Sequence, residues 1–138
     1  MKINRKPSLN IVLVEPEIPP NTGSIARLCG ATDTVLHLVH PLGFSTDDKH
    51  LKRAGLDYWP YVTINHWDNL DTFLASQNEL DLYFFTTKVS TPYTAAEYRP
   101  GACLVFGRET KGLPSEILNS YPERCYTLPM TNKKMRSL

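Results

Sequence analysis

The sequence predicts an α/β domain, with a mostly parallel sheet flanked by helices, and three observations support the prediction. Short apolar runs alternate along the chain with segments that have the apolar spacing of helices. Four of these runs are almost continuously apolar, as is typical of strands buried on both faces of a parallel sheet. The length of 138 residues suits a single core, so we expect one domain over residues 1–138.

Six segments are expected to be strands, and they differ in how clear their pattern is. The clearest are the apolar runs LNIVLVE (9–15), TVLHLVH (34–40), LDLYFFTT (80–87) and ACLVFG (102–107). The segment 61–67 alternates apolar and polar residues and is a weaker strand. The last segment, 125–130, is short and is ended by Pro129.

Helices are expected between the strands, each with a recognisable N-terminal residue. Asn21 is expected to cap a helix whose apolar stripe is formed by Ile25, Leu28 and Cys29. Similar signals are Thr46 before DDKHLKRA, Asp68 before a helix that packs Leu70, Phe73 and Leu74, and Pro114 before SEILNSY.

Composition and charge limit the possible partners. The net charge of +1 gives no overall attraction to nucleic acids or membranes, so RNA binding would need local basic patches. Cys29, Cys103 and Cys125 are widely spaced and form no CxxC pair, which is typical of free thiols in a reducing compartment. No run has the length of a signal-peptide core or a membrane span, so we expect a cytoplasmic protein.

Polar motifs follow the predicted strands at their carboxyl ends, which is where parallel sheets carry their sites. The segment VFGRETKGLP (105–114) places three charged residues and two glycines at such an end. Gly107 and Gly112 would allow a sharp turn or a close approach to a ligand, although a tight turn with solvated charges would use the same residues. Neither GxGxxG nor GxxxxGK[ST] occurs, which argues against a dinucleotide fold or a P-loop NTPase.

A second polar motif, PPNTGSIARLCG (19–30), opens the first predicted helix. Asn21, Ser24 and Arg27 have helical spacing and are expected on one face, opposite the apolar stripe. This would bring an amide, a hydroxyl and a guanidinium to the mouth of the sheet. The alternative is a capped surface helix with a solvated arginine.

Nucleophile and metal motifs are missing from the sequence. No serine lies in a GxSxG elbow, and no histidines have the spacing of HExxH. In HLVH, His37 and His40 are expected on opposite faces of a strand, so we expect no metal site.

The segment DDKHLKRAGLDYW (47–59) favours RNA binding. Lys49, Lys52 and Arg53 share a helical face, and Tyr58 lies nearby, so basic side chains could bind phosphates beside an aromatic ring that stacks on unpaired bases. A second basic cluster is NKKMR (132–136). A solvated helix face would show the same pattern.

Taken in order, LNIVLVEPEIPPNTGSIARLCGA, HPLGF, DDKHLKRAGLDYW, TTK, FGRETKGLP and LPM resemble the motifs of the SPOUT superfamily of knotted RNA methyltransferases. Within it, the chain is most similar to the small tRNA (cytidine/uridine-2'-O-)-methyltransferases that act on the wobble nucleotide. The resemblance covers residues 9–138. It implies a trefoil knot, S-adenosylmethionine as cofactor, tRNA as substrate, and a homodimer in which each site lies near the partner chain.

The resemblance also assigns roles to residues. Arg27 matches the family's catalytic arginine, and Asn21 matches the asparagine beside it. The positions that match the cofactor site are Thr86, Thr87, Lys88, Gly107, Glu109, Leu128, Met130 and Ser137. Because a guanidinium stays protonated, we expect Arg27 to stabilise the developing alkoxide and to position a phosphate rather than to act as a general base.

Members of the family continue past MRSL with an asparagine/serine-rich loop and a final helix, whereas this sequence ends at Leu138. We therefore expect an incomplete knot, either because a longer chain is truncated or because this is a variant without a complete site. The same motifs serve 2'-O-methyltransferases that modify other positions in tRNA or ribosomal RNA. The alternative from another class is an RNA-binding module without activity.

Overall fold

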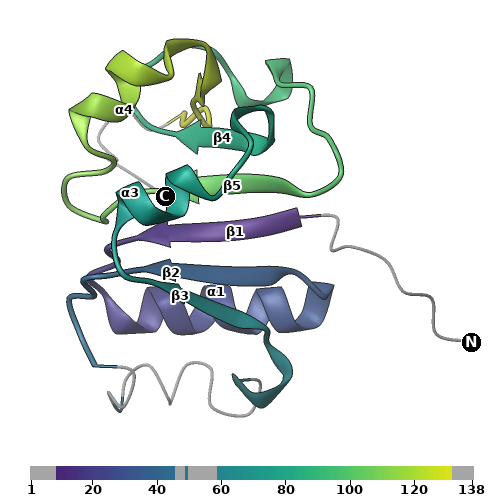
Figure 1. Ribbon diagram of the computed structural model, residues 1–138, viewed down its shortest axis with the longest axis vertical. Helices are drawn as coiled ribbons and strands as arrows, with labels where there is room; N and C mark the ends of the chain where they lie inside the picture. Colours follow the sequence, from purple (N-terminus) through teal and green to yellow (C-terminus); the bar gives the residue numbers. More distant parts are fainter. Residues whose placement is uncertain (1–8, 46–48, 50–58, 132–138) are drawn as a thin grey trace, which may run out of the picture.

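The computed structural model describes residues 9–45, 49 and 59–131. In this part of the chain, a six-stranded sheet has the order β3-β2-β1-β5-β4-β6, and each neighbouring pair is parallel (Figure 1). The strands are β1 (Leu9–Val14), β2 (Val35–Val39), β3 (Ile64–Trp67), β4 (Leu82–Phe85), β5 (Ala102–Phe106) and β6 (Cys125–Tyr126). The predicted α/β class with a parallel sheet is therefore confirmed.

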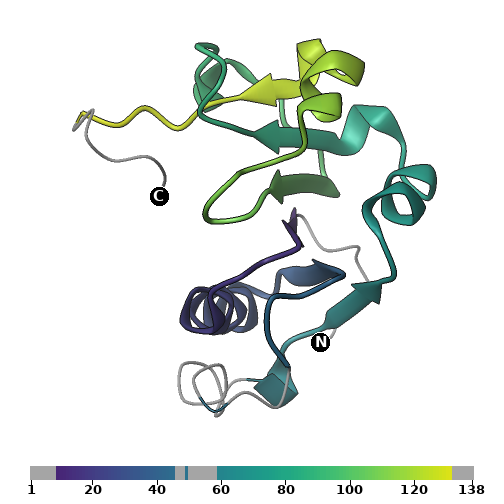
Figure 2. The same cartoon turned by 90° about the vertical axis from the view of Figure 1, so that its left-hand side faces the viewer.

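The helices lie on both faces of the sheet. They are α1 (Pro19–Thr32), α3 (Leu70–Ala75) and α4 (Ser115–Ser120), with the 3₁₀ turns η1 (Trp59–Tyr61), η2 (Glu79–Asp81), η3 (Tyr93–Ala95) and η4 (Pro122–Arg124). Figure 2 shows α1 on one side of the sheet and α3 and α4 on the other. Among the described residues, no helix combines the length and the apolar character needed to cross a membrane.

Successive strand residues face different layers, as the two-residue repeat of a strand requires. Val12 and Val14 of β1 belong to the core shared with α3 and α4, while Leu13 between them packs with Cys29 of α1. A third cluster, around Phe85 at the end of β4, lies on the face of α1. The core is therefore split into two layers by a sheet that is buried on both sides.

The last strand is shorter than the apolar run 125–130 predicts. Only Cys125 and Tyr126 pair with β4. The backbone of Thr127 instead pairs with the β4–β5 connection, donating to the carbonyl of Thr91 at 2.8 Å and accepting from the N–H of Tyr93 at 2.9 Å. The chain after β6 is thereby held over the edge of the sheet without extending the strand.

The predicted helix caps need two corrections. Asn21 does not cap α1, because the helix begins at Pro19 with Ile18 as N-cap, so Asn21 lies inside the first turn. Two prolines can start the helix early, since the first turn leaves its N–H groups unpaired in any case. For α3 the cap is Asn69 and not Asp68, because the Asn69 Oδ1 accepts from the Thr72 N–H at 2.8 Å.

For the other two predicted helices, one begins a residue later than predicted and one lies almost entirely outside the described residues. Pro114 was predicted to be the first helical position, but it is the N-cap of α4, and the helix begins one residue later at Ser115, which is within the usual uncertainty of a helix boundary. Thr46 and the rest of its predicted helix lie outside the described residues, apart from Lys49.

The buried face of α1 includes Cys29 from the predicted apolar stripe but not Leu28. Thr22, Gly23, Ala26 and Cys29 are buried, whereas Leu28 is 62% exposed. Small residues let α1 approach the sheet closely, since they add little volume between the helix and the strands. Leu28 is left on a face that borders the cavity described below.

A chain of partly buried polar groups crosses the sheet from β3 to the residue before β5. The Trp67 indole donates to the His37 Nδ1 at 3.0 Å, and the His37 Nε2 lies 3.0 Å from the Asn10 Oδ1. The Asn10 amide then donates to the carbonyl of Gly101 at 3.2 Å. Because an indole N–H can only donate, His37 must be neutral with its proton on Nε2. Burial lowers the pKa of His37 to about 4.

Candidate functional site

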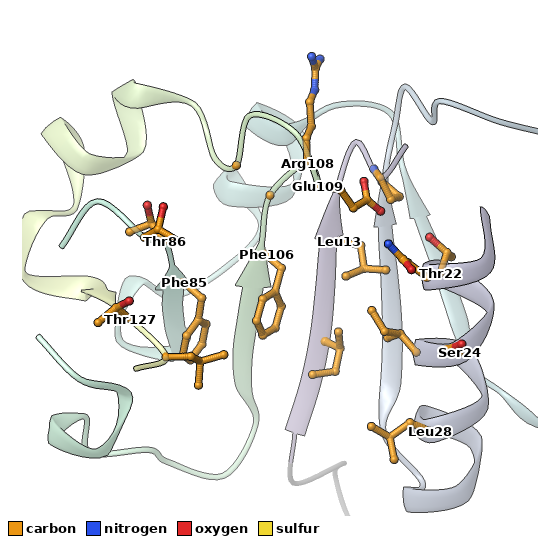
Figure 3. Close-up of a pocket in the computed structure, with 18 of the residues that line it drawn as sticks. Leu13, Thr22, Ser24, Leu28, Phe85, Thr86, Phe106, Arg108, Glu109 and Thr127 are labelled. Atoms are coloured by element: carbon orange, nitrogen blue, oxygen red, sulfur yellow. The ribbon is translucent and has the colours of Figure 1, made fainter. Parts of the chain in front are cut away.

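A cavity of about 1160 Å³ lies on the α1 side of the sheet and extends over the carboxyl ends of β1, β4 and β5. Its floor is apolar and includes Leu13, Phe85 and Phe106, whose side chains point into the space between α1 and the strands (Figure 3). Phe85 and Phe106 stack with ring centroids 4.9 Å apart. A cavity of this size, with an apolar floor and several polar lining residues, suits a ligand that has a flat apolar part.

The loop from Gly107 to Gly112 forms one end of the cavity and closes on itself. The N–H of Arg108 donates to the carbonyl of Gly112 at 3.2 Å, and the N–H of Gly112 donates back at 2.8 Å. A Cβ at Gly107 would lie 2.1 Å from the carbonyl carbon of Gly112, and Gly112 has a φ of +68°. The close approach that Gly107 permits is therefore an approach to its own loop, and each glycine is required by the backbone.

The charged side chains of this loop bind the connection between β1 and α1. Arg108 pairs with Glu15 at 2.5 Å, and this hydrogen bond raises the pKa of the guanidinium. The Glu109 carboxylate accepts from the N–H of Glu17 at 2.8 Å and from that of Ile18 at 3.3 Å. In Figure 3, Arg108 points away from the cavity, while Glu109 points towards the start of α1.

Glu17 completes the contact from the opposite side. Its carboxylate accepts from the Thr110 hydroxyl at 2.7 Å and from the Thr110 N–H at 3.1 Å. These two hydrogen bonds lower the pKa of Glu17. Lys111 is also at the rim of the cavity, and its side chain is exposed.

Most of the predicted site residues that lie in the described part of the chain line this cavity. The lining includes Asn21 and, from the predicted cofactor site, Thr86, Thr87, Lys88, Gly107, Glu109, Leu128 and Met130. They come from α1, from the ends of β4 and β5, and from the segment after β6. Thr86 is fixed there by its N–H, which donates to the carbonyl of Tyr126 at 3.0 Å, and its hydroxyl accepts from the N–H of Lys88 at 3.2 Å.

Arg27 lies outside the lining of the cavity. It shares the exposed side of α1 with Asn21 and Ser24, as the helical spacing predicts, but Asn21 and Ser24 border the cavity and Arg27 does not. Lys49 is exposed. The remaining predictions, Lys52, Arg53, Tyr58 and Ser137, lie outside the described residues.

Several residues at the cavity have no recognisable signal in the sequence. Glu17 and Thr110 are 93 positions apart, so no local pattern predicts that they bind each other. Thr22 is fully buried in α1, lines the cavity, and is the one residue in the described part of the chain whose buried hydroxyl lacks a hydrogen-bond partner.

A pair of histidines lies outside the cavity. The His40 Nε2 and the His66 Nδ1 are 2.8 Å apart, at the ends of β2 and β3. Partial burial, followed by the charge of His40, lowers the pKa of His66. Within the described ranges, no group of three or more His, Cys, Asp or Glu side chains has the arrangement of a metal site.

Comparisons with known proteins assign this fold and cavity to a family. Residues 8–138 match the SpoU rRNA Methylase family. The chain is 47% identical to the tRNA (cytidine(34)-2'-O)-methyltransferase of Escherichia coli K12, over 88% of this chain and 78% of that protein. It is 50% identical to the protein of the same name from Yersinia pestis, over 83% of this chain and 74% of that protein.

Solved structures agree with the sequence relatives. One described as "Structural insights into the 2-OH methylation of C/U34 on tRNA" superposes with a TM-score of 0.86 and 39% identity, covering 94% of this chain and 84% of that one. The match runs through both walls of the cavity, since it spans nearly all of the sequence. The protein belongs to the SpoU methylase family, within the SPOUT methyltransferases.

Proposed function

We propose that the protein methylates the ribose 2'-hydroxyl of the wobble cytidine or uridine in tRNA, with S-adenosylmethionine as the methyl donor. The observation that carries the proposal is the meeting of three distant segments at one cavity beside α1. These segments are the end of β4, the loop 107–112 and residues 127–130. Each comes from a motif that supports the family resemblance, and family members of known name modify tRNA at position 34.

The residues around the cavity fit S-adenosylmethionine. The stacked rings of Phe85 and Phe106, with Leu128 nearby, form an apolar surface suited to adenine. Thr86 and Thr87 offer polar atoms at the same cavity. When bound, the cofactor would supply a methyl group that is already activated by a sulfonium. The protein therefore has to provide alignment and to stabilise charge on the acceptor oxygen.

Within this function, α1 carries the groups that act on the acceptor. Arg27 would stabilise the negative charge that develops on the 2'-oxygen, and it would hold a neighbouring phosphate. Asn21, at the cavity, would orient the ribose by hydrogen bonds. Neither role requires the guanidinium to lose a proton.

A homodimer is part of the same proposal. Arg27 is exposed on α1 but does not line the cavity of its own chain. A second copy packed against α1 would let Arg27 reach the cofactor cavity of its partner. The exposed Leu28, next to Arg27, supports contact at this face. We place the dimer in the cytoplasm, where tRNA is modified.

Basic residues would bind the rest of the anticodon arm. Lys49 is exposed, and Lys52, Arg53 and Tyr58 are proposed to complete this contact. We also propose that residues 1–138 act as a single catalytic domain.

The test is methyl transfer from labelled S-adenosylmethionine to unmodified bulk tRNA, followed by nuclease digestion and mass spectrometry of the nucleosides. We expect 2'-O-methylcytidine or 2'-O-methyluridine at position 34. Methylation at another position would replace the substrate assignment. An absence of transfer, with tRNA binding retained and no binding of S-adenosylmethionine, would indicate an RNA-binding module.

Replacement of Arg27 tests its role in the same assay. Arg27→Ala is expected to lower kcat by about 100-fold or more, the usual effect of removing one group that stabilises an oxyanion. Affinity for S-adenosylmethionine, measured by calorimetry, should not change. Arg99→Ala is the control, because among the described residues its side chain forms only a surface ion pair, with Asp81 at 3.1 Å. If Arg27→Ala folds but no longer binds the cofactor, the assigned role is wrong.

A further inference from the structure

We infer that Glu17 and Glu109 form a reciprocal clamp that positions helix α1 against the cofactor loop 107–112. This inference rests on the proposed function. Each glutamate comes from one side of the cavity and binds backbone N–H groups of the other side. Both are positioning residues, because they act through the segments that they hold and not on the reacting atoms.

Helix α1 needs an acceptor at its N-terminus, and its own sequence does not provide one. The N-cap is Ile18, whose side chain cannot accept a hydrogen bond, and the next two residues are prolines without an N–H. Glu109 supplies the acceptor from 91 positions away, through bonds to the N–H groups of Ile18 and Glu17. A carboxylate is also the favourable charge at the positive end of a 14-residue helix.

The loop needs a second anchor, and Glu17 provides it. The bridge between Arg108 and Gly112 closes the loop but does not fix it relative to α1. Glu17 binds both the N–H and the hydroxyl of Thr110, at the tip of the loop. The ion pair between Arg108 and Glu15 adds a third contact in the same place.

The consequence is that the two walls of the cavity keep one relative position. Asn21, which borders the cavity, follows Ile18 by one helical turn. Loop 107–112 borders the cavity beside the start of α1. A displacement of about 1 Å between an aligned donor and acceptor costs roughly 100-fold in rate, so hydrogen bonds that fix this distance bear directly on methyl transfer.

The two glutamates should therefore have different effects on the reaction. Glu109→Gln is expected to lower kcat by roughly 10- to 100-fold, because it loosens the start of α1, which brings Asn21 to the cavity. Glu17→Gln is expected to raise the Kd for S-adenosylmethionine by about tenfold, the equivalent of about 1.4 kcal/mol, because it loosens the loop. Thr110→Val removes a donor to the same carboxylate and should not add to the effect of Glu17→Gln.

The experiment compares these variants with Glu116→Gln, an exposed glutamate in the first turn of α4 that takes no part in the clamp. Amide hydrogen exchange on the free protein gives a readout that does not depend on activity. The N–H groups of Glu17 and Ile18 should exchange at least about tenfold faster in Glu109→Gln, while the strands remain protected. Glu116→Gln should match the unmodified protein in exchange, kcat and Kd.

Two results would overturn the inference. One is unchanged exchange at Glu17 and Ile18 in Glu109→Gln. The other is a pair of glutamine variants whose kcat and Kd equal those of Glu116→Gln. If the unmodified protein transfers no methyl group to tRNA, the proposed function fails, but amide exchange still decides whether the clamp exists.

Discussion

At the scale of single residues, the most constrained polar group outside the cavity is the imidazole of His37. It accepts from Trp67 and donates to Asn10 only in its neutral form, because a proton on Nδ1 would face the indole N–H. The pKa of His37 is about 4 in the folded protein, well below its ordinary value of 6.5. Protonation therefore favours the unfolded chain.

The first prediction follows from that difference. His37 should contribute stability that is fully present above about pH 6.5 and is lost as the pH falls to about 4. The lost free energy of unfolding should be of the order of 3 kcal/mol, at about 1.4 kcal/mol for each tenfold difference in proton affinity. Urea unfolding at pH 7.5 and at pH 5 measures the part of this loss that falls between these two values, about 2 kcal/mol. His37→Gln serves as the control, and a decline of equal size in that variant would show that other groups are responsible.

The second prediction concerns Lys111. Its neighbours Arg108, Glu109 and Thr110 are all bound to the β1–α1 connection, whereas no described residue forms a hydrogen bond or ion pair with the Lys111 ammonium. The exposed side chain at the rim of the cavity is therefore suited to an RNA phosphate.

Lys111→Ala should weaken tRNA binding and lower the slope of log K against log salt by roughly 0.7 to 0.9, as expected for one lost phosphate contact. Filter binding at several salt concentrations gives the slope. Lys111→Arg should keep it near that of the unmodified protein. An alanine variant with the original slope would place the phosphate elsewhere.

The residues that line the cavity were easier to predict than the hydrogen-bond partners of their side chains. The family resemblance named Asn21, Thr86, Thr87, Lys88, Gly107, Glu109, Leu128 and Met130 as site residues, and all of them line one cavity. The contacts of Glu109 with Glu17 and Ile18 could not be predicted, because they join positions that are 92 and 91 residues apart. Such contacts depend on how the sheet brings two loops together, and no local propensity encodes that.

At the scale of elements, helix α3 gives the clearest prediction. Asn69 accepts from the N–H and the hydroxyl of Thr72, both at 2.8 Å, so it satisfies an N–H that would otherwise lack a partner at the start of the helix. Asn69→Ala should lower the free energy of unfolding by about 1 kcal/mol. Asp68→Ala, one position earlier, is the matched control and should have little effect. Equal losses in both variants would contradict the assignment of the cap.

Strands with a continuous apolar pattern could be predicted from the sequence. The buried face of a helix was harder to predict, because it depends on the elements that the helix packs against. Each of the six segments predicted as strands contains one in the structure. β-branched and aromatic residues favour strands locally, so these segments can be recognised without knowing their partners in the sheet. The buried face of α1 was predicted incorrectly at Leu28. Hydrophobicity alone favoured that residue, whereas close packing on the sheet selected Thr22, Gly23 and Ala26.

At the scale of the whole molecule, the proposed homodimer makes a separate prediction. Suppose that one chain carries Arg27→Ala and the other carries Gly107→Ala, whose Cβ would collide with the backbone of Gly112. Each homodimer should be inactive. A heterodimer should have one complete site if Arg27 acts in the partner's cavity, because the intact arginine and the intact loop then meet across the interface.

The two chains can be co-expressed with different tags, purified as the heterodimer, and assayed for methyl transfer to tRNA. Recovered activity is the expected result. A heterodimer as inactive as its parents would mean that Arg27 serves the cavity of its own chain.

The order of the strands in the sheet could not have been derived from the sequence, since the apolar runs are similar and any of them could occupy the centre.

The central position of β5 also affects the growing chain. Strands β1, β2 and β3 are complete once residue 67 has been made, but the second neighbour of β1 is β5, which ends at residue 106. At typical rates of translation, roughly 2 to 8 seconds separate these two points. During that interval one side of LNIVLV, an uncharged apolar strand, has no native partner available. Until β5 has emerged from the ribosome, the nascent chain is at its most vulnerable to aggregation.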